Sequence, residues 1–188
     1  MKILLINPPR NRAQTQNYGY TFSFAIACLS AMLKQNGYNP KILDLFDCLD
    51  WDSISQMLRT EQPDLVGITC LTNTRQSVFR LASIVKAINE RATVVVGGSH
   101  PTVLYEQILN SYAVDAVAIG EGDLTFVNLV RAVENGDPFD GVKGIGCGAT
   151  CGDRQSRNRT PPTFSDTHGP NPATLARTGA LLAPIRAM

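Results

Sequence analysis

The sequence predicts an α/β fold, a doubly wound (Rossmann-like or flavodoxin-like) five-stranded parallel sheet with helices on both faces. Short apolar runs alternate along the chain with segments of helical periodicity. Strands that are buried on both faces read as unbroken apolar runs, and parallel neighbours need helical crossovers between them. Right-handed crossovers then favour the strand order 2-1-3-4-5.

Five apolar runs supply the predicted strands. They are Lys2–Ile6, Lys41–Leu45, Leu65–Cys70, Val94–Val96 and Ala116–Ile119. Helical segments separate them, and punctuating residues mark several helix ends: Gly37 follows the first helix, Pro101 suits the first turn of the fourth, and Gly136 ends the last. The clearest periodicity recurs at i, i+3, i+4, i+7 and i+10 in Val78, Leu81, Ala82, Val85 and Ile88.

The chain changes character after residue 145. We assign residues 1–145 to one domain with the predicted sheet. From Gly146 onward periodicity vanishes, and Arg, Thr, Pro, Gly and Ala dominate. We expect residues 146–188 to be a disordered tail, or an end that is not native coding sequence.

Composition excludes several classes of function. The 188 residues are 44% hydrophobic and 18% charged with a net charge of +1, which favours neither nucleic acid nor an anionic membrane as partner. No apolar run approaches the roughly 20 residues of a membrane span, and the apolar stretch at the start of the chain is too short for a signal peptide. A cytoplasmic location is expected. The odd, scattered set of five cysteines argues against a disulfide framework.

Ligands of open parallel sheets bind beyond the carboxyl ends of the strands, so the loops there are the candidate site. Three of these loops are rich in small or hydroxyl-bearing residues: 69–73 (TCLTN), 97–100 (GGSH) and 120–123 (GEGD). Glycines let a ligand approach the main chain closely. The pattern favours a bulky, mostly neutral cofactor over a small charged substrate.

Other ligand classes fit less well. A phosphoacceptor domain needs acidic residues where Asn7 and Thr69 stand, and a flavodoxin needs a hydroxyl-rich loop after the first strand. The dinucleotide fingerprint is incomplete, because Gly120-x-Gly122 follows the fifth strand and lacks a third glycine. His100 and His168 are the only histidines, which leaves little general-base capacity, and no catalytic residue is assigned.

The motifs MKILLINPP, DLVGITCLTNT, VVVGGSHPT and VDAVAIGEGD resemble the cobalamin-binding N-terminal domain of cobalamin-dependent radical S-adenosylmethionine proteins. The resemblance covers Met1 to Ile145. It implies a Rossmann-like sheet that takes the cobalamin nucleotide tail among its strand ends, with the corrin ring over them. It also implies a radical S-adenosylmethionine domain or protein as partner, in a chemistry that typically relays a methyl group.

The resemblance implies a set of cofactor-binding residues at three strand ends. They are Thr69, Leu71, Thr72 and Asn73 after the third strand, Gly97, Gly98, His100 and Thr102 after the fourth, and Gly120, Glu121 and Gly122 after the fifth.

This sequence departs from related patterns at three places. Corrinoid proteins with a histidine on cobalt carry D-x-H-x-x-G after the second strand, whereas this chain has DLFDCLDW, so a histidine-off cobalt and no protein metal ligand are expected. Asp123 stands where the family has Glu and suits a helix N-cap. Cys147 and Cys151 have the first spacing of C-x-x-x-C-x-x-C, but Arg154 takes the third position, so no iron–sulfur cluster is expected in this chain.

Alternatives remain for each motif. Gly97-Gly98 also suits a tight strand-to-helix turn, His100 and the stretch from Thr69 to Asn73 suit helix capping, and Glu121 suits a solvated loop. The chain as a whole is then an interaction or sensory domain without cofactor, or a small enzyme that uses the same edge for a nucleotide. Whether this chain is itself an enzyme stays open.

Overall fold

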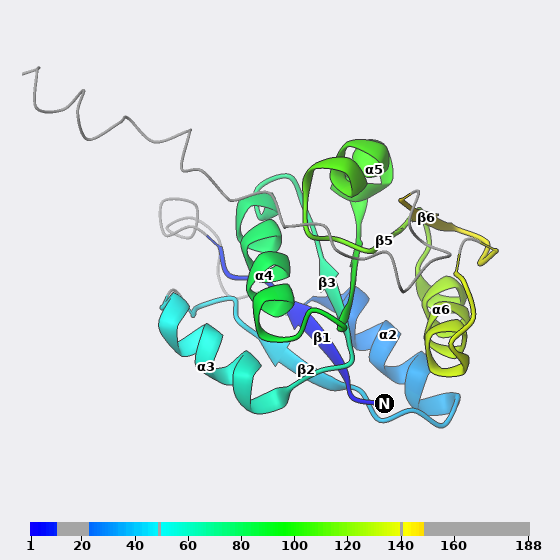
Figure 1. Cartoon of the computed structure of the whole chain (residues 1–188), viewed down its shortest axis with the longest axis horizontal. Coiled ribbons are helices and arrows are strands. Elements are labelled where there is room, and N and C mark those ends of the chain that lie inside the picture. Colours follow the sequence, from blue (N-terminus) through cyan, green and yellow to red (C-terminus); the bar gives the residue numbers. More distant parts are fainter. Residues whose placement is uncertain (11–22, 49, 140, 149–188) are drawn as a thin grey trace, which may run out of the picture.

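The computed structural model describes residues 1–10, 23–48, 50–139 and 141–148. Strands and helices alternate through these ranges (Figure 1). The strands are β1 (Ile3–Asn7), β2 (Lys41–Asp44), β3 (Leu65–Thr69), β4 (Thr93–Gly97), β5 (Ala116–Ala118) and β6 (Ile145–Cys147). The helices are α2 (Phe24–Gln35), α3 (Trp51–Glu61), α4 (Arg75–Ile88), α5 (Ser99–Ser111) and α6 (Asp123–Asn135).

These strands form one sheet in the order β2-β1-β3-β4-β5-β6. Neighbours from β2 to β5 pair in parallel, so the predicted fold class and the order 2-1-3-4-5 are confirmed. β6 pairs antiparallel with β5, with Cys147 opposite Ala116. The carboxyl ends of the parallel strands therefore meet at a single edge of the sheet.

The predicted number of strands was one too low. β6 is the short run Ile-Gly-Cys, so no apolar stretch marks it in the sequence. A Cβ at Gly146 would lie 2.9 Å from Cδ2 of Tyr105 on α5, and this close packing explains a glycine inside a strand. The expected domain boundary between residues 145 and 146 falls inside β6. Residues 149–188, the rest of the expected tail, lie outside the described residues.

Helices cover both faces of the sheet, as expected (Figure 1). Helices α3, α4 and α5 pack on the face that receives Leu4 and Ile6, and α2 and α6 pack on the face that receives Ile3 and Leu5. This division follows from the alternation of side chains along β1. It leaves two hydrophobic cores, one on each side of the sheet.

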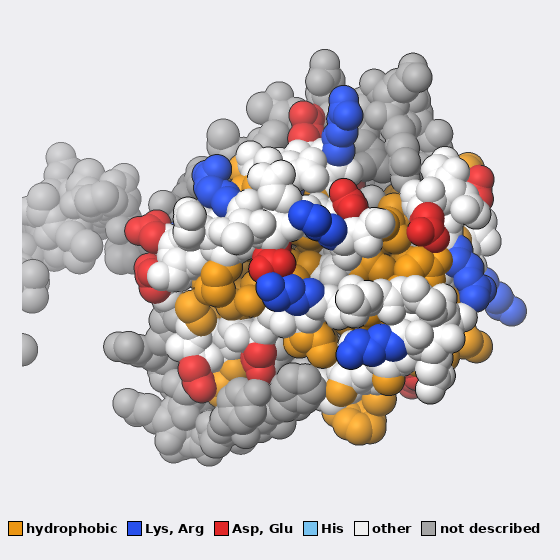
Figure 2. All heavy atoms as spheres, turned by 90° about the horizontal axis from the view of Figure 1, so that it is seen from below, with side chains coloured by type: hydrophobic (Ala, Val, Ile, Leu, Met, Phe, Trp, Pro, Cys, Tyr) orange, Lys and Arg blue, Asp and Glu red, His pale blue; other side chains and the backbone are white. Residues whose placement is uncertain are grey.

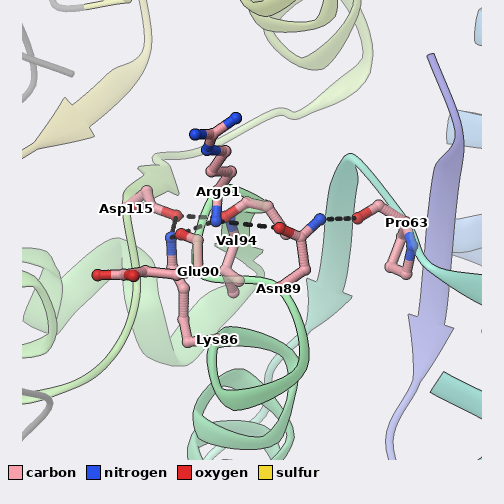
Figure 3. Close-up of polar contacts among 8 residues, drawn as sticks. Pro63, Lys86, Asn89, Glu90, Arg91, Val94 and Asp115 are labelled. Carbon is pink, nitrogen blue, oxygen red and sulfur yellow. Dashed lines mark hydrogen bonds and ion pairs between the residues drawn. The ribbon is translucent and has the colours of Figure 1, made fainter. Parts of the chain in front are cut away.

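A largely buried ion pair joins α4 to the amino-terminal ends of β4 and β5 (Figure 3). Lys86 Nζ lies 2.7 Å from Asp115 Oδ2, and the side chains are 13% and 14% exposed. The same carboxylate oxygen accepts a hydrogen bond from the Val94 amide at 2.7 Å, and Lys86 Nζ also donates to the Ala92 carbonyl at 2.7 Å. These contacts lie at the edge opposite the candidate loops.

Side chains of both charges are interspersed with hydrophobic ones on the face of the molecule that lies below the view of Figure 1 (Figure 2). This mixture agrees with the small net charge of the chain. Among the helices that the structure describes, we find none with the length and apolar character needed to cross a membrane.

Candidate functional site

A cleft of ≈ 290 Å³ opens at the carboxyl ends of the central strands, on the face covered by α2 and α6. One wall is formed by the first turns of α2, the other by the start of α6, and the sheet forms the floor. The buried residues that line it are all apolar: Leu5, Ile26, Gly67, Ile68, Val95, Ala118 and Phe126. We call the sheet residues among them and the Phe126 ring the floor of the cleft, that is Leu5, Gly67, Ile68, Val95, Ala118 and Phe126, whereas Ile26 belongs to the α2 wall.

The depth of the cleft is set by a contact between Gly67 and Phe126. A Cβ at Gly67, in the middle of β3, would lie 2.7 Å from Cζ of Phe126 and 3.0 Å from Cδ2 of Leu5. The absent side chain thus lets the Phe126 ring of α6 lie directly against the sheet. Neither residue was among the predicted site residues. A glycine inside the apolar run LVGIT was nevertheless a sign that another group packs closely against this strand.

Six of the eleven predicted site residues line the partly exposed rim of this cleft: Thr69, Gly97, Gly98, Gly120, Glu121 and Gly122. The other five, Leu71, Thr72, Asn73, His100 and Thr102, lie in the neighbouring turns and are not part of its lining. Asp123, which we expected to be an N-cap, is the first residue of α6, and Gly122 holds the N-cap position. The strand ends thus bring the three predicted loops to one edge, while the cleft lies towards α2 and α6.

The two adjacent glycines after β4 have different roles. Gly98 has φ +116°, and a Cβ there would lie 2.6 Å from the Cys70 carbonyl oxygen, so the turn accepts only a glycine at this position without strain. Gly97 has an ordinary backbone, and its Cβ would only reach ordinary contact with Ala118 Cβ at 3.4 Å. Both glycines line the cleft, but only Gly98 is also required by the tight turn after β4.

Thr102 joins two of the rim loops. Its Oγ1 donates a hydrogen bond to the Gly98 carbonyl at 2.8 Å and accepts one from the Gly120 amide at 3.1 Å. Gly120 has φ +73°, and apart from its chain neighbours no described residue has an atom within 4 Å of the position of a Cβ there. The hydroxyl of Thr102 is thus used within the protein, where it holds the loops after β4 and β5 together.

Thr72 and His100 form a second polar pair at this edge. Thr72 Oγ1 lies 3.2 Å from His100 Nδ1, and the Thr72 carbonyl accepts a hydrogen bond from Arg75 Nη1 at 2.6 Å. Partial burial, together with the positive charge of Arg75, lowers the pKa of His100 below its ordinary value of 6.5. The imidazole is therefore neutral at neutral pH.

The turn before α4 is closed by Thr74, which the sequence did not single out. Its Oγ1 accepts a hydrogen bond from the Leu71 amide at 3.0 Å and donates one to the Leu71 carbonyl at 3.2 Å. Thr74 holds the N-cap position of α4, directly after the stretch from Thr69 to Asn73 for which helix capping was the alternative. This turn leaves the Leu71 side chain 41% exposed at the edge.

Comparison with known proteins places these features in a family. The family model of the B12 binding domain matches residues 15–130. An uncharacterized methyltransferase of Pyrococcus horikoshii is 36% identical over 148 residues, and an anaerobic magnesium-protoporphyrin IX monomethyl ester cyclase of Rubrivivax gelatinosus is 32% identical over 139 residues. The alignments cover 77% and 72% of this chain but only 32% and 25% of the relatives, so the chain spans a third of their length or less.

Solved structures show the same fold. The radical S-adenosylmethionine methyltransferase TsrM from Kitasatospora setae, solved with cobalamin and a [4Fe-4S] cluster bound, matches with a TM-score of 0.66 at 21% identity. The match covers 77% of this chain and 27% of TsrM. The cobalamin-dependent S-adenosylmethionine radical enzyme OxsB matches with a TM-score of 0.65 at 19% identity, over 77% of this chain and 20% of OxsB.

The family match, the parallel sheet and the open cleft at its carboxyl edge agree with one another. The match of the B12 binding domain model extends over most of the segment that forms the sheet. The chain therefore belongs to the B12-binding domain family and resembles the cobalamin-binding part of radical S-adenosylmethionine methyltransferases.

Proposed function

We propose that this chain holds cobalamin with the nucleotide tail in the cleft between α2 and α6 and the corrin ring over the carboxyl edge of the sheet. The observation that carries the proposal is the cleft itself, with its apolar floor and glycine rim. The protein leaves space open beside Gly97 and Gly120, where a side chain would project into the entrance. A large, mostly neutral group fits such a site better than a small anion does.

The predicted site residues divide into three groups in this proposal. The rim residues Thr69, Gly97, Gly120, Glu121 and Gly122 contact the tail. Leu71, Thr72, Asn73 and His100 lie on the neighbouring turns and meet the corrin ring from the sheet edge. Gly98 and Thr102 act indirectly, because the first shapes the turn after β4 and the second ties that turn to the loop after β5.

We also propose that no histidine of the protein binds cobalt from below. In the segment after β2, Phe46 stands where the D-x-H-x-x-G pattern has its histidine, counted from Asp44. Phe46 is 3% exposed, and the guanidinium carbon of Arg10 lies 4.7 Å from its ring centroid. Asp44 is itself engaged, because its Oδ1 accepts hydrogen bonds from Asn7 Nδ2 and the Phe46 amide.

The activity of the whole protein is a further part of the proposal. Cobalamin carries the difficult chemistry in such enzymes, typically the relay of a methyl group, and the protein orients the corrin and excludes water. We propose that this domain works with a radical S-adenosylmethionine domain or protein, and that residues 1–188 themselves hold no iron–sulfur cluster. Cys147 and Cys151 have the first cluster spacing, but Arg154 occupies the third position.

A reducing, cytoplasmic location fits the cysteines. In the described part of the chain, Cys28, Cys48, Cys70 and Cys147 are free thiols. Burial raises the pKa of the Cys70 thiol to about 12, which keeps it protonated. Free thiols persist where the compartment is reducing.

Mixing the purified protein with hydroxocobalamin and separating it by gel filtration tests the proposal. We expect the protein peak to carry the visible absorbance of the corrin. After reduction to cob(II)alamin, the electron paramagnetic resonance spectrum should lack nitrogen splitting from an axial histidine, and replacing His168 should leave binding unchanged. A colourless protein peak would overturn the binding proposal, and nitrogen splitting that His168→Ala abolishes would overturn the histidine-off proposal.

A further inference from the structure

Among the described residues, those that bring polar side chains to the cleft lie at its entrance. Among the residues that line it, the side chains of Thr69, Glu121 and Asp123 bear oxygen, and all three are at least partly exposed. The floor carries only aliphatic groups, glycine and the Phe126 ring. Within the described ranges, every buried side-chain nitrogen or oxygen already has a hydrogen-bond partner. The floor therefore offers no side-chain donor or acceptor to a ligand.

The main chain of the floor is occupied as well. Gly67 of β3 is in register with Val95 of β4, which is in register with Ala116 of β5. In a parallel sheet the amide and carbonyl groups of such central strands bond to the neighbouring strands. A ligand group that reaches the floor can therefore make van der Waals contact but gains no hydrogen bond.

We infer that the cleft selects corrinoids by the base of their nucleotide tail, accepting a benzimidazole and discriminating against a purine such as adenine. This inference rests on the proposed function. The 5,6-dimethylbenzimidazole of cobalamin has an outer edge of methyl and C–H groups, which suits an aliphatic floor. Adenine carries an amino group and ring nitrogens on its outer edge, and these lose their water without gaining a partner.

The volume of the cleft supports this selection. At ≈ 290 Å³ it is near the lower end of ligand pockets, which commonly hold about 300–1,000 Å³. A bicyclic base therefore leaves little room for water to remain with its polar edge. Removing hydrogen-bond partners from buried polar groups commonly weakens binding about tenfold or more.

Leu29 is the position at which a substitution can change the preference for one base over another with the smallest expected loss of stability. It lies on the α2 wall, it is only partly buried, and its Cδ2 lies 3.7 Å from the position of a Cβ at Gly122. Leu29→Gln brings an amide to the wall, whereas Leu29→Met keeps the wall apolar with a similar volume. The ratio of affinities for two corrinoids in one variant is insensitive to a general loss of stability.

The test compares three corrinoids in the Co(I) state, in which cobalt holds no lower ligand, so that the tail is free of the metal in each. They are cobalamin, pseudocobalamin with adenine as the base, and cobinamide, which lacks the tail. Dissociation constants are measured under anaerobic conditions by equilibrium dialysis. We expect cobalamin to bind at least about tenfold more tightly than pseudocobalamin. Leu29→Gln should narrow this ratio, and Leu29→Met should preserve it.

The outcomes separate the two proposals. Equal affinity for cobalamin and pseudocobalamin, with cobinamide weaker, overturns base selection and leaves cobalamin binding in place. Equal affinity for all three overturns both base selection and the placement of the tail in this cleft. Failure of all three to bind overturns the proposed function itself.

Discussion

The hydroxyl of Thr102, on α5, accepts a hydrogen bond from the amide of Gly120, in the loop after β5, at 3.1 Å. The same hydroxyl donates to the Gly98 carbonyl at 2.8 Å. One side chain therefore joins two loops that border the cleft. Thr102 was predicted to bind the cofactor, and in our proposal it contributes by positioning these two loops.

Thr102→Val removes both hydrogen bonds and keeps the shape of the side chain. We expect weaker cobalamin binding, because the loops after β4 and β5 lose their common anchor, and a stability loss of about 1 kcal/mol. Thr102→Ser restores the hydroxyl and should restore affinity. Titration with hydroxocobalamin and urea unfolding measure the two effects. A valine variant that binds with unchanged affinity would contradict the positioning role.

Gly97→Leu tests the cleft directly. Val95 faces the core under α2 and α6, so Gly97, two residues along the strand, presents its new side chain to the same face. Because a Cβ at Gly97 meets only ordinary contact, the fold should tolerate the change within about 1 kcal/mol. We expect cobalamin affinity to fall at least tenfold, roughly the effect of a 1.4 kcal/mol penalty.

Gly141→Leu is the matched control for Gly97→Leu. Gly141 is exposed, and apart from its chain neighbours no described residue has an atom within 4 Å of the position of its Cβ, so both binding and stability should stay near wild type. If Gly97→Leu binds cobalamin as tightly as Gly141→Leu does, the tail does not enter beside Gly97.

Gly98→Ala should destabilise the folded protein whether or not cobalamin is bound. The φ of +116° is strained for any residue with a Cβ, at a cost of roughly 1–3 kcal/mol, and the Cβ also meets the Cys70 carbonyl at 2.6 Å. We expect a lower unfolding midpoint in urea with or without cobalamin. An apo protein of unchanged stability would show that the turn after β4 relaxes without cost.

Asp115 tests the scaffold at the opposite edge. Asp115→Ala leaves Lys86 without its carboxylate and the Val94 amide without its acceptor, so we expect a loss of about 3 kcal/mol. Asp115→Asn keeps an acceptor for the amide and should lose less. Chemical unfolding measures both variants. Equal stability of Asp115→Ala and wild type would mean that the pair of Lys86 and Asp115 contributes nothing net.

The pH dependence of stability should carry a contribution from His100. Partial burial and the charge of Arg75 lower its pKa in the folded state, so the unfolded chain binds the proton more readily. Stability is therefore unaffected well above pH 6.5 and falls as the pH drops from the ordinary pKa of 6.5 through the lower folded value.

His100→Gln should weaken this acid-induced loss, which unfolding curves between pH 7 and pH 5 measure, at pH values chosen to bracket the ordinary histidine pKa. Titration of the His100 ring protons by NMR gives an independent value for its pKa. A pKa at or above that of an exposed histidine would contradict the expected direction.

Local patterns were sufficient for the parallel sheet and its strand order. The run Val94–Val96 and the periodic segment from Val78 to Ile88 each carry their own signal, and right-handed crossovers connect such elements in one way. The glycines that follow β4 and β5 could likewise be identified from the sequence alone. β6 was missed because the three residues Ile-Gly-Cys contain no apolar run long enough to predict a strand. They form a strand because they pair with β5.

The sequence alone determined which residues reach the carboxyl edge, because strand direction and loop position follow from the alternation of apolar and helical segments. Which contacts those residues make at the edge depends on the tertiary structure. Phe126 closes the cleft against Gly67, the Cys70 carbonyl leaves no room for a side chain at Gly98, and Thr102 bonds to Gly120. Each of these contacts joins residues on different elements, so no local periodicity encodes it, and it exists only once the sheet and its helices have packed.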